Sequence, residues 1–467
     1  MHRKTILAAL ALACLTSASG PSWGTDSPSS EAAAVERLQD AYAQSVTPGE
    51  DALRFRARLA TVLQRLKRSS VATVDLAALA HDATRALETL PPAVGDPEKV
   101  FKTAVDAAAA AMRAIDPYFR YVDARRFAYE RQDTPGSFGG LGMQVESSDN
   151  GVRIVSLIPD SPAARASALA PGDVIVRVDD QPLAGMTLGD AILRMRGQPG
   201  SQVTITVQRS GHDAEISVAL TRDTIRREVL SSSFQDDVLV LRLSAFAPAA
   251  AARVEQAVAQ ATATASPKAV VLDLRGNPGG LLIEAVKVAD LFLKAGEIVS
   301  VRRQEPARSR SWQSEPSELL ADLPMVVLID GRSASASELV ADALQHHGRA
   351  TVMGQRSYGK GSVQTTLPLG PDDGAIKLTT ALYYGPSGQT VHRVGVAPDI
   401  ELLSPFPANT ARKDPEVLVG TRQPQARIDP ARCVDAVAAD PALACATVFL
   451  RTGRLGALGS SLGEDAR

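Results

Sequence analysis

The chain has 467 residues, with 50 Lys and Arg against 52 Asp and Glu, and a formal net charge of -2 at pH 7. This length predicts two to four domains, and the balanced charge argues against a general nucleic-acid or membrane-surface binder, whose surface would be basic. Hydrophobic residues make up 45% of the chain, which is usual for a soluble globular protein.

The N-terminus has the parts of a secretory signal. The basic start MHRK precedes the apolar run TILAALALACL and the tract TSASGPSWG, which is rich in small residues. This pattern predicts a signal peptide over residues 1–24, because the apolar run is too short to span a bilayer. We therefore expect an exported protein, periplasmic in a bacterium. Cys14 ends the run in ALAC, which loosely resembles a lipoprotein attachment site, so lipid anchoring is the alternative.

Two cysteines remain in the mature chain, Cys433 and Cys445. In an oxidising compartment they could form a local disulfide. The sequence is equally consistent with two small apolar residues on a helix.

Four segments follow the signal. Residues 25–137 are Ala-rich with helical spacing and predict a helical N-terminal module. Residues 138–222 consist of short β-type runs with Gly and Pro turns and predict a small β domain. Residues 223–403 contain two strand–turn–helix units, AVVLDLRG with LLIEAVKVADLFLKAG and MVVLID with ASELVADALQHHG, which predict a sheet with parallel strands covered by helices. Residues 404–467 predict a C-terminal tail with a short helix near 440–452. The fold class is multidomain α/β.

The small β domain resembles PDZ domains in GGLGM at 139–143 and APGDVIVRVDDQPLAG at 170–185. In a PDZ domain a Gly turn offers backbone N–H groups to a peptide's terminal carboxylate, and the next strand accepts the peptide as an added strand. A Gly-Leu-Gly turn could also be a plain β-turn, and the bound tail could belong to a substrate or to a neighbouring subunit. The cradle positions would be Gly140, Leu141, Gly142 and Met143.

The stretch DGRSASASELVADALQ places Ser333, Ser335 and Ser337 directly before a helical pattern. Helix amides and the macrodipole favour negative charge at such a turn, as an attacked carbonyl requires. The rival interpretation is a capping box, in which Ser335 and Glu338 satisfy the first amides of the helix. The stretch only approximates the G-x-S-x-G motif.

A base must lie elsewhere, and the histidines offer none. His2 is in the signal, His81 and His212 are in other domains, His346 and His347 close a helix, and His392 has no obvious Asp partner.

Lys360, in GQRSYGKGSVQTTLPL, is the better candidate for the base, because burial could leave its amine neutral. Gln364 could hold that amine through its side-chain carbonyl. Alternatively, Lys360 is a surface cation in a Gly-rich turn.

Four motifs in order, DLRGNPGGLL, DGRSASASE, GKGSVQ and LTTALYYGPSG with GVAPDI, resemble the carboxy-terminal processing peptidases of the S41 serine protease family. The resemblance covers most of residues 95–403, including AIDPYFRYV. It implies that Ser335 is the nucleophile, Lys360 the general base and Gln364 its orienter.

The RGNPGG motif implies the oxyanion hole, formed by the Ala336 amide with an amide of Gly279 or Gly280. A Gly turn needed only for its backbone geometry would explain the motif equally well. The implied function is an exported serine endopeptidase that cleaves proteins near their C-termini, recruits their tails through the PDZ-like domain and needs no cofactor. The sequence does not identify the natural substrate, any adaptor protein or the oligomeric state.

Two rival functions come from other classes. GQRSYGKG at 354–361 nearly matches the phosphate loop G-x-x-x-x-G-K-[ST], but Gly361 stands in the hydroxyl position and a strand follows. The alternative is a non-catalytic PDZ scaffold or ligand-binding protein on the same fold, and the presence of Ser335, Lys360 and Gln364 together argues against it. The sequence has no H-E-x-x-H motif and no Cys/His cluster, so it predicts no metal site.

Overall fold

The computed structural model describes residues 28–90, 95–132, 137–212, 214–226, 228–316, 318–370, 373–403, 422–433 and 440–454. The predicted signal peptide and Cys14 lie outside the described residues. The chain divides into two compact units: residues up to Leu63 with Asp75–Ala111, and Gln64–Val74 with the chain from Met112 onward. None of the described helices combines the length and apolar content that crossing a membrane requires.

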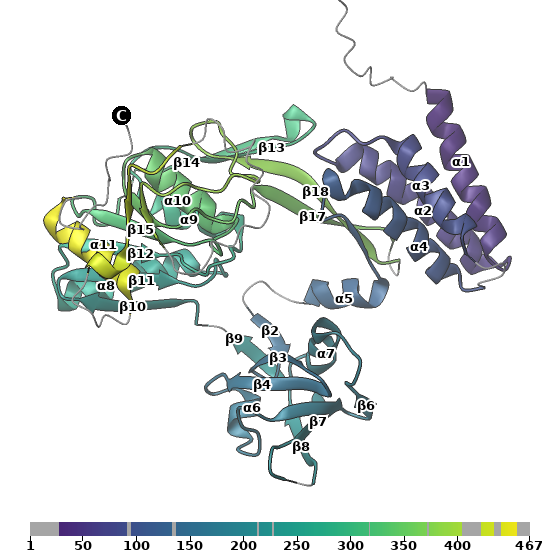
Figure 1. Ribbon diagram of the computed structural model, residues 1–467, viewed down its shortest axis with the longest axis horizontal. Coiled ribbons are helices and arrows are strands. Elements are labelled where there is room, and N and C mark those ends of the chain that lie inside the picture. Colours follow the sequence, from purple (N-terminus) through teal and green to yellow (C-terminus); the bar gives the residue numbers. More distant parts are fainter. Residues whose placement is uncertain are drawn as a thin grey trace, which may run out of the picture. The chain divides into compact units, whose positions relative to one another are not determined.

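The first unit is helical (Figure 1). It contains α1 (Pro28–Ser45), most of α2 (Glu50–Ser69), α3 (Leu76–Glu88) and α4 (Pro97–Ala111). Asp75 starts α3 as its N-cap, because its carboxylate accepts the Ala78 amide at 2.9 Å. Tyr42 is fully buried, and its hydroxyl donates to the Pro97 carbonyl at 3.1 Å. The helical module predicted for 25–137 ends earlier here, because the chain from Met112 belongs to the second unit.

The small β domain has a six-stranded sheet in the order β3-β4-β5-β7-β8, with β6 paired to β5. Alternation sets its core, since Val152 and Ile154 of β4 are buried while Val155 is exposed. Strand β3 pairs only with β4 among the described residues, so its other edge can accept a strand. The elements are β2 (Ser137–Gly140), β3 (Met143–Ser148), β4 (Gly151–Leu157), α6 (Pro162–Arg165), β5 (Val174–Val178), β6 (Gln181–Pro182), α7 (Leu188–Met195), β7 (Gln202–Gln208), β8 (Ile216–Thr221) and β9 (Asp223–Arg226).

A seven-stranded sheet forms the centre of the remaining core, in the order β10-β11-β12-β15-β16-β19-β20. Figure 1 labels four of its strands, β10, β11, β12 and β15. All neighbours are parallel except β10 and β11. The strands are β10 (Leu230–Gln235), β11 (Val238–Leu243), β12 (Ala269–Asp273), β15 (Met325–Ile329), β16 (Thr351–Gly354), β19 (Ile400–Leu402) and β20 (Ala426–Ile428).

Both faces of this sheet are buried, which explains why β12 and β15 are continuously apolar in sequence. Leu272 and Val327 pack in one hydrophobic cluster with α8 (Ala250–Thr264), α9 (Leu282–Asp290) and α10 (Ala336–His346). Val271 and Val326 pack in a second cluster with α11 (Pro441–Thr452). The structure thereby confirms the predicted α/β multidomain fold class.

A second, antiparallel sheet has the order β1-β18-β13-β14, and β17 also pairs with β18. The long strand β18 is therefore the centre of this sheet. Its strands are β1 (Arg120–Val122), β13 (Gly296–Arg302), β14 (Arg310–Ser314), β17 (Ser362–Pro368) and β18 (Ala375–Tyr384). The same unit also contains three short helices, η1 (Met112–Ala114), α5 (Ala124–Gln132) and η2 (Pro306–Arg308).

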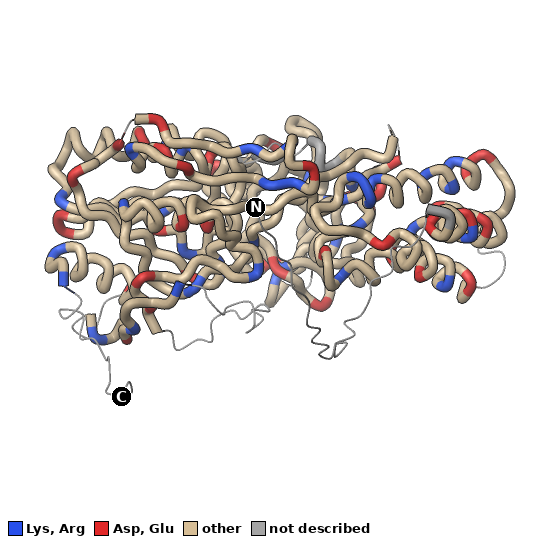
Figure 2. The backbone as a smooth tube through the Cα atoms, turned by 90° about the horizontal axis from the view of Figure 1, so that it is seen from above, with Lys and Arg blue, Asp and Glu red and all other residues tan. Residues whose placement is uncertain are grey.

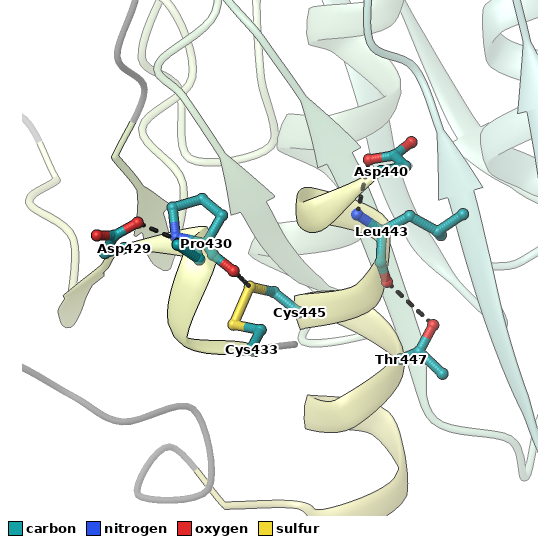
Figure 3. The surroundings of a disulfide bond; sticks show 8 residues. Asp429, Pro430, Cys433, Asp440, Leu443, Cys445 and Thr447 are labelled. Carbon is teal, nitrogen blue, oxygen red and sulfur yellow. Dashed lines mark hydrogen bonds between the residues drawn. A yellow bond between two sulfur atoms is a disulfide. The ribbon is translucent and has the colours of Figure 1, made fainter. Parts of the chain in front are cut away.

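The C-terminal region does more than form the predicted tail. Strand β20 extends the parallel sheet, and α11, close to the predicted 440–452 helix, covers one face of that sheet. Cys433, at the end of η4 (Pro430–Cys433), forms a disulfide with Cys445 of α11 (Figure 3). The bond closes a local loop, which restricts the unfolded chain and so stabilises this region.

Charges are mixed over the described chain. Figure 2 shows Lys and Arg interspersed with Asp and Glu.

Candidate active site

Ser333 and Ser335 lie on the turn that joins β15 to α10, Ser337 lies in the first turn of α10, and the three serines make different contacts. The Ser333 hydroxyl donates to the Leu274 carbonyl at 2.8 Å, and the Ser337 hydroxyl donates to the Asn277 carbonyl at 2.9 Å. Both side chains are fully buried and hold the turn against the chain after β12. Ser335 is half-buried and faces neither of these partners. The geometry therefore separates Ser335 from its two neighbours.

Ser335 has a strained backbone, with φ 55° and ψ -115°. A non-Gly residue in this region costs on the order of 1–3 kcal/mol, and such strain is common at functional sites. Ser335 and Glu338 form a capping box at the start of α10, in which the Ser335 amide donates to Glu338 Oε2 at 2.8 Å. The Glu338 amide also donates to the main-chain carbonyl of Ser335 at 2.9 Å. The capping box is therefore present, and the strained backbone of Ser335 is a separate feature of the same residue.

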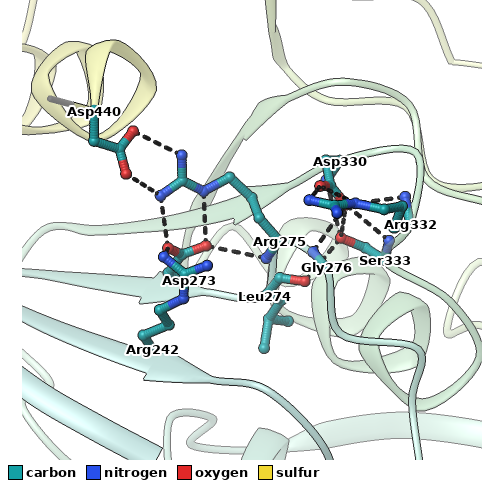
Figure 4. A network of polar contacts seen from close by, with 9 residues as sticks. All are labelled: Arg242, Asp273, Leu274, Arg275, Gly276, Asp330, Arg332, Ser333 and Asp440. Atoms are coloured by element: carbon teal, nitrogen blue, oxygen red, sulfur yellow. Dashed lines mark hydrogen bonds and ion pairs between the residues drawn. The ribbon is translucent and has the colours of Figure 1, made fainter. Parts of the chain in front are cut away.

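The Asp330 carboxylate closes the turn before Ser335 (Figure 4). Its Oδ1 accepts the amides of Gly276, Arg332 and Ser333 at 2.9 to 3.0 Å. Burial opposes ionisation of Asp330, but these hydrogen bonds and the Arg332 guanidinium keep its pKa below the ordinary value. The carboxylate thereby joins the serine turn to the Gly-rich turn.

Gly279 approaches Ser335 so closely that only glycine fits. A Cβ on Gly279 would lie 2.9 Å from Ser335 Cβ and 3.0 Å from the Ala336 amide nitrogen. Its φ of +103° also disfavours any other residue. The structure therefore brings the Gly turn, Ser335 and Ala336 together, as the predicted oxyanion hole requires.

The two candidate glycines differ in their amides. Gly279 donates its amide to Asn277 Oδ1 at 2.8 Å. Among the hydrogen bonds of the described residues, none is donated by the amides of Gly280 or Ala336. These two amides are therefore free to donate hydrogen bonds to a ligand oxygen in this arrangement.

Arg275 anchors the start of the Gly turn (Figure 4). Its guanidinium donates to Asp273 at 2.7 and 2.8 Å and to Asp440, the N-cap of α11, at 2.6 and 2.8 Å. Burial disfavours the charge, but the two carboxylates raise the pKa of Arg275 above its already high ordinary value. The C-terminal helix is thus ionically bound to the strand end that leads to Gly279.

Lys360 lies on the loop between β16 and β17. The Tyr358 amide donates to the Ser333 carbonyl at 3.0 Å, and the Arg393 amide donates to the Gly359 carbonyl at 2.7 Å. A Cβ on Gly361 would lie 2.5 Å from the His392 nitrogen, so a larger residue could not follow Lys360 without moving this chain. The two glycines that flank Lys360 therefore permit close packing of the loop.

Glu338 joins the serine turn to this loop. The side chain is completely buried. Its Oε2 accepts the amides of Ser335 and Lys360, both at 2.8 Å, and its Oε1 accepts the Gly359 amide and the Ser357 hydroxyl, both at 2.6 Å. Burial raises the pKa of the Glu338 carboxyl, and the four hydrogen bonds oppose that shift.

The Ser357 hydroxyl accepts the Val396 amide at 2.6 Å, so its own proton is directed to Glu338. All four partners of Glu338 are therefore donors, which is the arrangement that an ionised carboxylate requires. Sequence analysis identified Glu338 only as a capping residue. The second role of Glu338 leaves no signal in the sequence. Two of its donors, the amides of Gly359 and Lys360, belong to YGKG, and no local pattern relates that stretch to Glu338.

The Lys360 amine is half-buried and lies 5.6 Å from the centroid of the Tyr118 ring. Burial lowers its pKa, the nearby Lys377 lowers it further, and Glu338 raises it in part. Among the hydrogen bonds of the described residues, none joins this amine to the Ser335 hydroxyl. The structure thus brings the main-chain amides of Ser335 and Lys360 to one carboxylate oxygen, without a hydrogen bond between their side chains among the described residues.

Gln364 lies in β17, opposite Thr379 of β18. Its amide nitrogen donates to the Ser362 hydroxyl at 2.8 Å and to the Thr379 hydroxyl at 3.4 Å. His392 is not part of a triad: burial lowers its pKa, and its Nδ1 has no hydrogen-bond partner in the described chain. No group of His, Cys, Asp and Glu among the described residues could hold a metal ion.

Three of the four predicted PDZ positions, Leu141, Gly142 and Met143, form one end of a groove of about 280 Å³ between β3 and α7. The fourth, Gly140, pairs with Asp223 of β9 and does not line this groove. The carbonyl of Leu141 accepts the Ala163 amide at 2.9 Å, and that of Gly142 accepts the Ile158 amide at 2.8 Å. Because a trans peptide places its N–H opposite its carbonyl, the following amides face away from these partners. The apolar residues of the groove are Leu141, Met143, Val145, Ile192 and Met195.

We predict that Glu338→Gln releases the lysine loop. A Gln side chain presents an NH₂ group where one oxygen accepted two donors, so at least two buried donors lose their acceptor. The core should lose about 2–4 kcal/mol of stability, and the amides of Gly359 and Lys360 should exchange hydrogen faster, as measured by urea unfolding and hydrogen exchange.

Glu284→Gln is the matched control. This buried carboxyl accepts one amide, that of Ala251 at 3.1 Å, which a Gln oxygen can replace, and it forms one ion pair, at 3.5 Å, with the largely exposed Lys287. Equal effects of both variants on the lysine loop would show that Glu338 is an ordinary buried acid.

Comparison with protein families matches residues 237–402 to peptidase family S41 and residues 139–220 to a PDZ domain. A carboxy-terminal-processing protease of Bartonella bacilliformis is 41% identical over 317 residues, which are 67% of this chain and 72% of the relative. A probable CtpA-like serine protease of Staphylococcus haemolyticus is 31% identical over 308 residues, which are 66% of this chain and 61% of the relative.

Among solved structures, a photosystem II D1 C-terminal processing protease is 24% identical, with a TM-score of 0.49. The alignment covers 79% of this chain and 97% of that chain. The identity and coverage of the Bartonella relative and the two family matches confirm the family resemblance that the motifs predicted. The chain therefore belongs to peptidase family S41, as a serine-type carboxy-terminal processing endopeptidase that carries a PDZ domain.

Proposed function

We propose that the protein is an exported endopeptidase that cuts other proteins near their C-termini. Ser335 is the nucleophile, Lys360 is the general base, Gln364 orients the lysine, and the PDZ groove holds the substrate tail. The observation that carries this proposal is the binding of the Ser335 and Lys360 amides to one oxygen of Glu338. A strained serine at a helix N-terminus and a partly buried lysine are thereby held in one site.

Acylation begins when neutral Lys360 accepts the proton of the Ser335 hydroxyl. The Ser335 oxygen bonds to the substrate carbonyl carbon, and the negative charge moves to the carbonyl oxygen. The Ala336 amide and a glycine amide of the Gly turn, Gly280 in this arrangement, stabilise that oxyanion. The lysine amine must move from its position near Tyr118 to reach the hydroxyl, since catalytic hydrogen bonds commonly tighten when substrate binds.

The ammonium of Lys360 then gives its proton to the leaving amine as the C–N bond breaks. In the second half, Lys360 accepts a proton from water, whose oxygen attacks the acyl ester. The proton returns to Ser335 as the ester bond breaks. All steps use groups of this chain and one water, so the mechanism needs no cofactor.

Tail recruitment follows from the PDZ groove. Amides that follow Leu141 and Gly142 can bind a carboxylate, the free edge of β3 can pair with the extended tail, and the apolar lining suits an apolar last residue. Export is supported by the Cys433–Cys445 disulfide, which is typical of oxidising compartments. We place the protein in the periplasm, with lipid attachment at Cys14 as the alternative.

Ser335→Ala and Lys360→Ala should each lower cleavage of unfolded casein at least about 1000-fold, because each removes a group that bonds or moves a proton in the reaction. Gel assays with sequencing of the cut ends measure this, and circular dichroism checks that both variants fold. The control is Lys268→Met, which replaces an exposed lysine that has no role in the proposed mechanism. Substantial cleavage by Lys360→Ala would exclude the lysine as base.

Lys377→Met should move the acidic limb of the kcat/KM profile to higher pH. Removing the Lys377 charge takes away one cause of the lowered pKa of Lys360, so that pKa rises and less neutral amine is present at a given pH. Activity should fall near neutral pH and recover at high pH. If the acidic limb lies at the same pH in Lys377→Met and in the unchanged protein, Lys360 does not titrate in the catalytic step.

Ile192→Asp should weaken binding of a peptide with an apolar, free C-terminus at least about tenfold, because it puts a charge into the apolar groove. Fluorescence anisotropy with the full-length Ser335→Ala chain measures this without cleavage. Val155→Asp, at a β4 residue that is 45% exposed, is the matched control. The same peptide with an amidated C-terminus has no terminal carboxylate. Equal binding of the free and amidated peptides would contradict carboxylate recognition.

A further inference from the structure

The orientation of the Gln364 amide depends on a contact far away in sequence. Strands β17 and β18 shift register between Val363 and Gln364, so that Val363 pairs with Ala381 but Gln364 pairs with Thr379. A β-bulge of this kind re-aims side chains. It places Gln364 opposite Thr379, while Thr380 contacts Thr365 at 2.6 Å between the hydroxyl oxygens.

The Thr379 hydroxyl has only one proton, and its partner is Asp116. Asp116 Oδ1 accepts the Thr379 hydroxyl at 2.8 Å, and its Oδ2 accepts the Thr379 amide at 2.7 Å. A carboxylate can only accept, so the hydroxyl proton is directed to Asp116. Thr379 Oγ1 can then only accept from Gln364, which fixes the NH₂ end of the Gln364 amide toward it.

Asp116 is itself held rigidly. It is 3% exposed, its Oδ1 also accepts the Tyr118 amide at 3.0 Å, and its own amide donates to the Met112 carbonyl at 2.7 Å. The same turn therefore carries Tyr118, whose ring lies beside the Lys360 amine.

With both nitrogen contacts made to Thr379 and Ser362, the carbonyl oxygen is the end of the Gln364 amide that has no hydrogen bond to any described residue. We propose that Asp116, acting through the Thr379 hydroxyl, is a positioning residue that fixes this oxygen as the end of Gln364 available to Lys360. This inference rests on the proposed roles of Lys360 and Gln364.

The orientation matters because the two ends of an amide act oppositely on an amine. The oxygen accepts an N–H of lysine and leaves the nitrogen lone pair free for the serine proton. The NH₂ end would donate to that lone pair and compete with the serine. It would also disfavour the ammonium, so a reversed amide lowers both the reaction rate and the pKa of the base.

Thr379→Val tests the relay, because it removes the hydroxyl and keeps the branched shape and the backbone contact to Asp116. We expect kcat for casein cleavage to fall about tenfold with KM unchanged, and the acidic limb of the profile to move to lower pH. Thr379→Ser should restore kcat and the limb. Thr365→Val, which removes a hydroxyl from the neighbouring Thr365–Thr380 pair, is the control and should change neither.

The same substitution in the Gln364→Ala background distinguishes positioning from packing. If Thr379 acts through Gln364, Thr379→Val should there lower kcat less than twofold further. A second tenfold loss, or a Thr379→Ser variant as impaired as Thr379→Val, would overturn the inference while leaving the Ser–Lys mechanism intact. Cleavage that persists in Lys360→Ala would instead overturn the proposed function and this inference with it.

Discussion

The buried Glu338 carboxylate is the interaction on which the site depends. Placing a charge in the core is unfavourable, and four hydrogen-bond donors offset that cost. Two donors come from residues proposed to react, Ser335 and Lys360, and both bind through main-chain amides. The carboxylate therefore does not engage their side chains, and the same contact that satisfies the carboxylate holds the strained backbone of Ser335. Stability and chemistry are coupled at one side chain.

The parts of the fold that the sequence predicted are those with local causes. The buried runs at β12 and β15 and the apolar face of α10 follow from periodicity and burial on both sides of a parallel sheet. The order of the motifs also predicted the family. The choice between a helix cap and a nucleophile could not be made from DGRSASASE alone, because Glu338 caps the helix and binds the lysine loop at the same time.

What the sequence did not predict depends on contacts between distant segments. Asp116 and Thr379 are separated by 263 residues, and their contact forms only when β1 pairs with β18. Strand β20 and helix α11 likewise join the core only after a long connection. Because that connection is rich in Pro and charged residues, the sequence predicted a tail for the whole region. The disulfide could not be decided either, since it requires η4 and α11 to be packed together.

The C-terminal helix lies beyond residues 237–402, the part that matches the S41 family, yet it reaches the strand end before the Gly turn. Asp440 and Asp273 share Arg275, and Arg242 lies 3.7 Å from Asp273, so two guanidinium groups balance two carboxylates. Asp273 is buried and Arg275 nearly so, whereas Arg242 and Asp440 are partly exposed. The Arg275–Asp273 pair is therefore costly to open, because each of these two groups left alone would lose its partner without regaining full hydration. Asn277 and Gly279 follow Arg275 closely in the chain, so fixing Arg275 also limits the movement of the Gly turn. A small displacement of that turn would separate it from Ser335.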